Sequence, residues 1–258
     1  MSIKFTILGC GSSVGVPRAD GFWGNCNPKD SKNYRTRCSA ILRTKNLSIL
    51  IDTSPDLRNQ LINNKIINID KVLYTHMHAD QTHGINDLRV FYLKNKKKID
   101  VYADKLTSNY LKNNFSYCFY GFKDYPKILK LNKLKKDMFF YDGVKKIHIK
   151  TVIVKHGFIN CMSFIINKKC AYASDVSKIH QKDLYLFKKL NFFVVDCLRF
   201  QKHSSHFNLD EVLKLVNIIK PKKTILTNLN TELDYNYLLN NLPRSVLPAY
   251  DGLSFNIK

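Results

Sequence analysis

The chain has 258 residues, of which 45% are hydrophobic and 12% aromatic, with only 10 Gly and 7 Pro. A chain of this length and composition buries about 70–75% of its unfolded surface, which excludes a disordered, fibrous or low-complexity protein. Its 42 basic and 20 acidic side chains give a net charge of +22, which favours an anionic substrate, but the bases are spread along the chain and do not by themselves predict a nucleic-acid partner.

Strand-like and helical segments alternate along the whole chain, which predicts a mixed α/β (α+β) fold. The expected strands cover residues 3–8, 39–43, 47–51, 71–75, 99–102, 147–154, 162–166, 171–174, 192–195, 224–227 and 253–257. The expected helices cover residues 55–63, 85–93, 105–118, 182–190, 209–219 and 231–239. Ser54 and Asn208 precede two of these helices and are typical helix N-caps.

No Gly/Ser/Pro-rich linker or internal repeat divides the sequence, so we expect a single domain over residues 1–258. Two stretches read as irregular. Residues 11–37 are rich in Gly, Pro, Asn and Asp, and residues 123–136 are rich in Lys. Each is interpreted as a lid over a site or as a surface loop, and for the second stretch the surface loop is favoured.

Seven cysteines, an odd number with no C-x-x-C pair, favour a reducing compartment over a disulfide framework. No apolar run reaches the ~18–20 residues that cross a bilayer, and residues 1–5 lack the pattern of a secretion signal. We therefore expect a cytoplasmic location with no membrane partner.

The most informative segment is residues 74–84, which follow an expected strand and precede an expected helix. His76 and His78 lie at positions i and i+2, so on an extended chain both project to the same side. Asp80 follows two residues later, where the chain turns. Two imidazoles with one carboxylate and no thiolate form a typical ligand set for a first-row divalent metal.

Residues 75–80 resemble the T-H-x-H-x-D-H signature of the metallo-β-lactamase fold superfamily of metal-dependent hydrolases. The resemblance extends over nearly the whole chain, through residues 8–13, 51–54, 155–157, 173–175, 205–209 and 225–228. Within the superfamily the sequence is most similar to the PhnP-like branch, which contains a phosphoribosyl cyclic phosphate phosphodiesterase. This resemblance implies a four-layer αββα sandwich, with a metal site along one edge where strand ends converge.

The resemblance also implies roles for individual residues. By position, His76, His78 and His156 would hold a first metal ion, Asp80 would belong to a second, and Asp175 would bridge the two. The position of His206 implies a catalytic general acid or a group that stabilises a phosphate oxygen, with His203 as a weaker candidate. Asp80 is also a candidate catalytic base that orients water.

Two positions depart from the family pattern. Gln81 and Asn228 stand where the family has histidine ligands of the second metal. The second site is therefore expected to be weak, to suit a harder ion such as Mn²⁺, or to hold no tightly bound ion. His83 is a candidate to compensate, and the alternatives for it are a helix-surface position or a supporting role beside the ligands.

The expected function is that of a metal-dependent phosphodiesterase that uses one or two divalent ions, Zn or Mn. Metal-bound hydroxide would attack a small, anionic cyclic or nucleotide-like phosphodiester. The alternatives are an RNA-processing nuclease resembling ribonuclease Z, and a catalytically weakened metal-binding protein. A nucleic-acid partner is not favoured over a small substrate, because no Gly-rich arm for gripping tRNA is evident. The branch resemblance suggests a homodimer.

Overall fold

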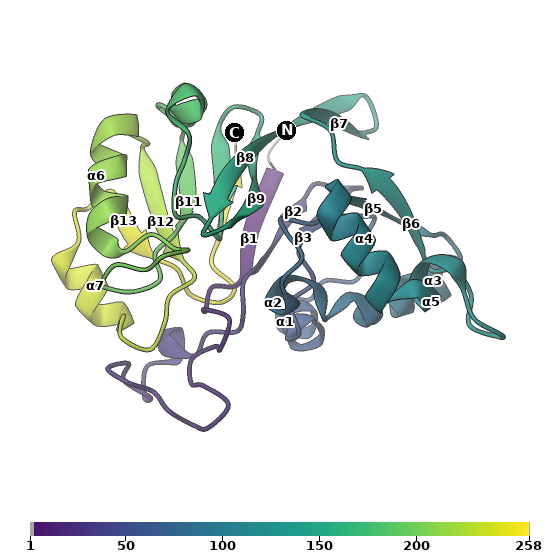
Figure 1. Cartoon of the computed structure of the whole chain (residues 1–258), viewed down its shortest axis with the longest axis horizontal. Coiled ribbons are helices and arrows are strands. Elements are labelled where there is room, and N and C mark those ends of the chain that lie inside the picture. The colour runs from purple at the N-terminus through teal and green to yellow at the C-terminus, as the bar shows by residue number, and fades with distance from the viewer. Residues whose placement is uncertain (1–2, 258) are drawn as a thin grey trace.

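Two β-sheets lie face to face at the centre of the computed structural model, which describes residues 3–257 (Figure 1). Within these residues each sheet has seven strands. The first has the order β14 (Ser254–Ile257), β1 (Ile3–Gly9), β2 (Ser39–Arg43), β3 (Ser48–Ile51), β4 (Lys71–Leu73), β5 (Ile99–Ala103) and β6 (Leu129–Lys133). The second has the order β13 (Val246–Pro248), β12 (Lys223–Thr227), β11 (Phe192–Asp196), β10 (Cys170–Ala173), β9 (Ile159–Ile166), β8 (Lys145–His156) and β7 (Asp137–Asp142).

Strand direction brings several carboxyl ends to a common edge. In the first sheet β3, β4, β5 and β6 are parallel neighbours, and in the second β10, β11, β12 and β13 are parallel. Strand β8 runs in the same direction as β10, because both pair antiparallel with β9. Residues that follow β10, β11 and β12, and the last residue of β8, therefore lie at one edge of the second sheet.

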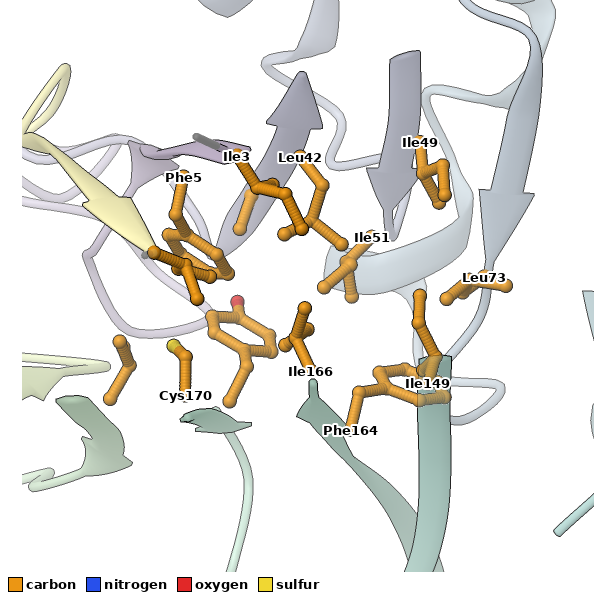
Figure 2. Close-up of a cluster of buried hydrophobic side chains, with 14 of the residues drawn as sticks. Ile3, Phe5, Leu42, Ile49, Ile51, Leu73, Ile149, Phe164, Ile166 and Cys170 are labelled. Carbon is orange, nitrogen blue, oxygen red and sulfur yellow. The ribbon is translucent and has the colours of Figure 1, made fainter. Parts of the chain in front are cut away.

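The core between the sheets consists of apolar side chains from both inner faces (Figure 2). Figure 2 shows Phe5, Ile51 and Leu73 from the first sheet opposite Ile149 and Phe164 from the second. Each is less than 1% exposed. Alternate residues of a strand point to opposite faces, so the other side chains of the same strands bury a second surface outside the sandwich.

Helices cover both outer faces, which confirms the expected four-layer αββα sandwich (Figure 1). Helices α6 (Leu209–Ile219) and α7 (Tyr235–Asn241) and the 3₁₀ helix η3 (Gln181–Phe187) pack on the second sheet. The first sheet is covered by α1 (Leu57–Asn63), the 3₁₀ helix η2 (Ile85–Leu88), α3 (Arg89–Asn95), α4 (Lys105–Asn114) and α5 (Ser116–Tyr120). The short α2 (Ala79–Thr82) begins directly after the His76/His78 segment, and η1 (Ser31–Asn33) lies in the early loop.

The structure corrects several expected elements. Residues 123–136 are not only a loop, because they contain the edge strand β6, and β7 and β13 also form strands that the sequence did not predict. The helix expected at 105–118 is broken at Phe115, whose φ of −129° ends α4 before α5 begins. The helix expected at 231–239 begins only after Asp234, because its side chain caps α7 by accepting from the Tyr237 N–H.

Asn208 caps α6 as predicted. Its side chain accepts from the Glu211 N–H at 3.0 Å, and the Glu211 carboxylate accepts from the Asn208 N–H at 3.1 Å, which forms a capping box. Ser54 instead accepts from the N–H of Asp56, the N-cap residue of α1. Among residues 3–257, no helix combines the length and apolar character needed to span a bilayer.

Candidate metal centre

Three imidazoles from two sheets converge at the common edge. His76 and His78 lie in the segment between β4 and α2, and His156 is the last residue of β8. One ring nitrogen from each of the three lies within 4.8 Å of the others. The Nδ1 atom of His78 lies 2.9 Å from Nε2 of His76 and 3.3 Å from Nε2 of His156. Nitrogens that share a tetrahedral ion at 2.0–2.1 Å stand about 3.3–3.4 Å apart, so this spacing suits a common ion.

The hydrogen-bond partners of His76 favour the tautomer that carries its proton on Nδ1. The Thr75 hydroxyl donates its single proton to Asp52 Oδ2 at 2.8 Å, while the Thr75 N–H donates to Asp52 Oδ1. The Thr75 oxygen then accepts from Nδ1 of His76, which lies 3.0 Å away. Nε2 of His76 is therefore left with a free lone pair that faces His78 and His156.

His156 is oriented in the same way by the opposite sheet. Its Nδ1–H donates to the Ser205 carbonyl at 2.7 Å, so its Nε2 also presents a lone pair to the cluster. Burial lowers the pKa of His76 to about 3 and lowers that of His156, so both rings are neutral at pH 7. Nδ1 of His78 faces the Nε2 lone pairs of both His76 and His156, and a proton on Nδ1 could satisfy only one of them. A cation that accepts all three lone pairs therefore fits this donor set.

Asp175 supplies a carboxylate beside His156 and His206. It follows β10, is 2% exposed, and forms a second group with His156 and His206 whose ligand atoms lie within 4.8 Å of one another. Burial opposes its ionised form, but the neighbouring histidine rings, of which His206 is protonated at neutral pH, hold the pKa of Asp175 below its ordinary value. Asp175 shares His156 with the three-imidazole cluster, and its ionised carboxylate would complete a ligand set suited to a divalent ion.

His206 lies in the loop before α6 and is held by Asp196, the last residue of β11. Its Nδ1 donates to Asp196 Oδ2 at 2.6 Å, and the same oxygen accepts from the Val176 N–H at 2.9 Å. Although burial acts against the charged ring, the Asp196 carboxylate raises the pKa of His206 to about 9. His206 is consequently protonated at neutral pH, which is the form that a general acid needs.

The remaining residues expected at the site fall into two groups. Asp80, Gln81 and Asn228 lie beside Asp175, and the amide nitrogens of Gln81 and Asn228 are 3.4 and 3.2 Å from its two oxygens. Burial, together with the nearby Asp175 charge, raises the pKa of Asp80 to about 6. His83 instead lies on the exposed side of the segment after α2, with Nε2 3.0 Å from the Tyr110 hydroxyl. This position favours the helix-surface alternative for His83.

Asp52 and Asp196 are the supporting residues that spacing alone did not identify. Both are fully buried and both follow or end a strand, which was the only available signal in the sequence. Each orients an imidazole, Asp196 directly and Asp52 through Thr75. Carboxylates behind metal-ligating or acidic histidines fix their tautomer and raise their basicity.

Comparison with known proteins finds a matching family model and several solved structures with the same fold. The family model of a β-lactamase superfamily domain matches residues 48–227. Among solved structures, a diphosphatase of the PhnP family is 27% identical with a TM-score of 0.90, over 100% of this chain and 98% of that one. The Zn²⁺-bound PqqB of Methylobacterium extorquens is 16% identical with a TM-score of 0.77, over 98% and 100% of the two chains. The human short-form tRNase Z is 15% identical with a TM-score of 0.70, over 99% of each.

A curated relative is longer. The octanoyltransferase of Porphyromonas gingivalis is 29% identical over 256 residues, which cover 97% of this chain. The aligned part is only 51% of that protein, so the chain spans about half the length of this relative.

Proposed function

The chain belongs to the metallo-β-lactamase superfamily of hydrolases, and we propose that it is a metal-dependent phosphodiesterase that acts on a small, anionic cyclic or nucleotide-like phosphodiester. The observation that carries the proposal is the convergence of His76, His78 and His156, each presenting a ring nitrogen to one point. The solved diphosphatase of the PhnP family supports hydrolysis at phosphorus.

The site residues divide the work between binding and proton transfer. His76, His78, His156 and Asp175 would hold a divalent ion, which when bound lowers the pKa of water and neutralises charge on a phosphate. Asp80, with a pKa of about 6, is ionised at neutral pH and orients water or accepts its proton. His206 donates its Nε2 proton to the leaving oxygen, while Asp196 holds the ring by Nδ1.

Burial of the histidines favours this chemistry over simple ion storage. His76 and His156 are 2% and 5% exposed, so an ion there is largely removed from bulk water. Charges in such a setting interact more strongly with a developing phosphate charge than they do in water. The protonated His206 beside Asp175 adds a donor where an anionic leaving group would need one.

All seven cysteines are buried and unpaired, and they lie in the described residues. Unpaired thiols support our proposal that the protein works in a reducing compartment such as the cytoplasm. Burial raises the pKa of Cys161, the thiol nearest to His76, well above its usual range. A thiol of this kind is a packing group rather than a nucleophile.

A metal-reconstitution assay tests the proposed function. The protein is stripped with a chelator, reloaded with Zn²⁺ or Mn²⁺, and assayed on bis-p-nitrophenyl phosphate, cyclic nucleotides and a nucleoside diphosphate derivative. We expect metal-dependent turnover that is lost in His76→Ala. A precursor tRNA and an octanoyl thioester are assayed in parallel, because turnover confined to either one would replace the phosphodiesterase proposal. If no substrate shows metal-dependent turnover and His76→Ala behaves like the wild type, the proposal fails.

A further inference from the structure

The surroundings of Asp175 limit how many ions the site can hold. Both carboxylate oxygens face a side-chain amide: Oδ1 lies 3.2 Å from Nδ2 of Asn228, and Oδ2 lies 3.4 Å from Nε2 of Gln81. A carboxylate is only an acceptor, so each amide must turn its NH₂ group toward it. All three side chains are at most 2% exposed, which leaves little water to take over either contact.

The orientation of Asn228 is fixed by a further bond. Its Nδ2 also donates to the Ser174 carbonyl at 2.9 Å, and a carbonyl again accepts only from the NH₂ side. Asn228 follows β12 with a φ of +62°, a left-handed conformation that Asn adopts more readily than most residues. The Ser174 carbonyl and the backbone conformation of Asn228 therefore direct the amide protons of Asn228 toward Asp175.

Of the remaining candidate ligands around Asp175, His156 and His206 already have other partners, which leaves Asp80 as one further carboxylate and no second centre. His156, Asp175 and His206 form a compact group, but Nδ1 of His156 is bonded to Ser205 and its Nε2 faces the His76/His78 pair. Nδ1 of His206 is bonded to Asp196. An ion in this group would have to take His156 away from the three-imidazole cluster, so the two groups cannot both be filled.

We propose that the centre binds one divalent ion per chain, and that Asn228 and Gln81 replace a second ion by donating hydrogen bonds to Asp175. This inference rests on the proposed metal-dependent function and specifies its metal content. The two neutral amides hold the carboxylate in place as a second cation would, but without adding a positive charge. They act as positioning residues for Asp175.

Gln81 supplies a second feature of the arrangement. Its Oε1 is buried and has no hydrogen-bond partner among the described residues. An amide that turned this oxygen toward a hard cation, and its NH₂ away, would satisfy the orphan acceptor. It would also remove the donor from Asp175. If the NH₂ group of Gln81 faces Asp175, one ion per chain is expected, and if Oε1 faces a hard cation, two are expected. Counting bound Mn²⁺ as well as bound Zn²⁺ distinguishes the two orientations.

Metal stoichiometry on the whole chain tests the inference without using activity. Stripped wild type, Gln81→His/Asn228→His, and a control with two added surface histidines, Asn114→His/Gln181→His, are titrated with Zn²⁺ and with Mn²⁺ by calorimetry. Bound metal is then counted by elemental analysis after desalting. We expect about one ion per chain in the wild type and the control, and about two in the Gln81/Asn228 variant.

Each outcome decides a different claim. Two ions in the wild type, with either metal, would overturn the inference and leave the proposed function standing. One ion in both the wild type and a folded Gln81/Asn228 variant would show that these amides do not exclude the second ion. No bound ion in the wild type would overturn the proposed function as well. Circular dichroism establishes whether each variant folds, and the wild-type count remains a test if the double variant does not.

Discussion

The His206 ring donates from Nδ1 to the Asp196 carboxylate across 2.6 Å, and Asp196 is completely buried. Its other partner on the same oxygen is the Val176 backbone N–H, while its Oδ1 has no partner among the described residues. Among residues 3–257, His206 is the one cationic side chain that pairs with Asp196. The protonated form of His206 is stabilised by this pairing, because an unpaired buried carboxylate is costly.

The first prediction concerns the alkaline limb of activity. Burial lowers the pKa of His206, but the Asp196 carboxylate outweighs burial and brings it to about 9. Below that pH the ring carries the proton it must donate, and above it the acid form is lost. Turnover should therefore hold through neutral pH and decline near pH 9. Asp196→Asn removes the main group that raises this pKa and leaves only the weaker effects of Asp175 and Asp80 against burial, so the decline should move to clearly lower pH.

The kcat-against-pH profile of both proteins checks this prediction, with Asp137→Asn as a matched control. Asp137 also holds a histidine, His148, at 2.7 Å, but on β7 and β8 rather than at the site. Its profile should match the wild type. An unchanged alkaline limb in Asp196→Asn would mean that His206 is not the acid.

The second prediction concerns metal-dependent stability. Because ligand binding stabilises only the folded state, free metal at 100 times its Kd should raise the free energy of unfolding by about 2.7 kcal/mol. His156→Ala removes one of three converging imidazoles and should abolish most of this gain. His148→Ala removes a histidine outside the site and should keep it. Thermal unfolding with and without Zn²⁺ measures the difference, and an equal shift in all three proteins would argue against an ion at His156.

The third prediction concerns the residues behind His76. Asp52→Asn keeps the size of the side chain and tolerates the φ of +61° found at this position. The substitution replaces the carboxylate that accepts from the Thr75 hydroxyl with a weaker acceptor. Because Thr75 in turn orients His76, the His76 tautomer is held less firmly. Loss of such supporting bonds typically costs 10–100-fold in metal affinity. Thr75→Val should cost a similar amount, whereas Thr44→Val, which removes a hydroxyl in a distant hairpin, should leave the affinity unchanged. Competition with a chromophoric chelator gives the Kd values of the wild type and the three variants.

Local spacing in the sequence predicted the centre of the site but not its support. His76, His78 and Asp80 are close in the chain, so their shared position followed from strand geometry alone. The bond from His206 to Asp196 and the chain from His76 to Asp52 depend on which strand ends meet across the sheets. No spacing rule gives that information. It required the sheet order, and only the family resemblance linked His156 and Asp175 to the pair.

The strands that were missed share a position in the fold. β6, β7 and β13 are all edge strands of their sheets. An edge strand pairs on one side only, and natural edges carry charged residues or proline, which weaken the apolar pattern. β6 has two lysines among its five residues, and β13 ends in Pro248. The inner strands carry long apolar runs because both their faces are buried, and these runs were correctly predicted.

The last prediction tests the core that holds the two sheets, and through them the two halves of the site, in register. Phe164 on β9 is completely buried between the sheets, in the cluster shown in Figure 2. Phe164→Ala removes most of a buried ring and leaves a cavity, so it should lower the free energy of unfolding by about 3–5 kcal/mol. Phe158→Ala is the matched control, because Phe158 in the β8–β9 turn is 102% exposed and should cost less than about 0.5 kcal/mol. Urea unfolding of the metal-free proteins measures both values. If the two variants lost equal stability, the packing between the sheets would not be what holds His76 and His78 opposite His156.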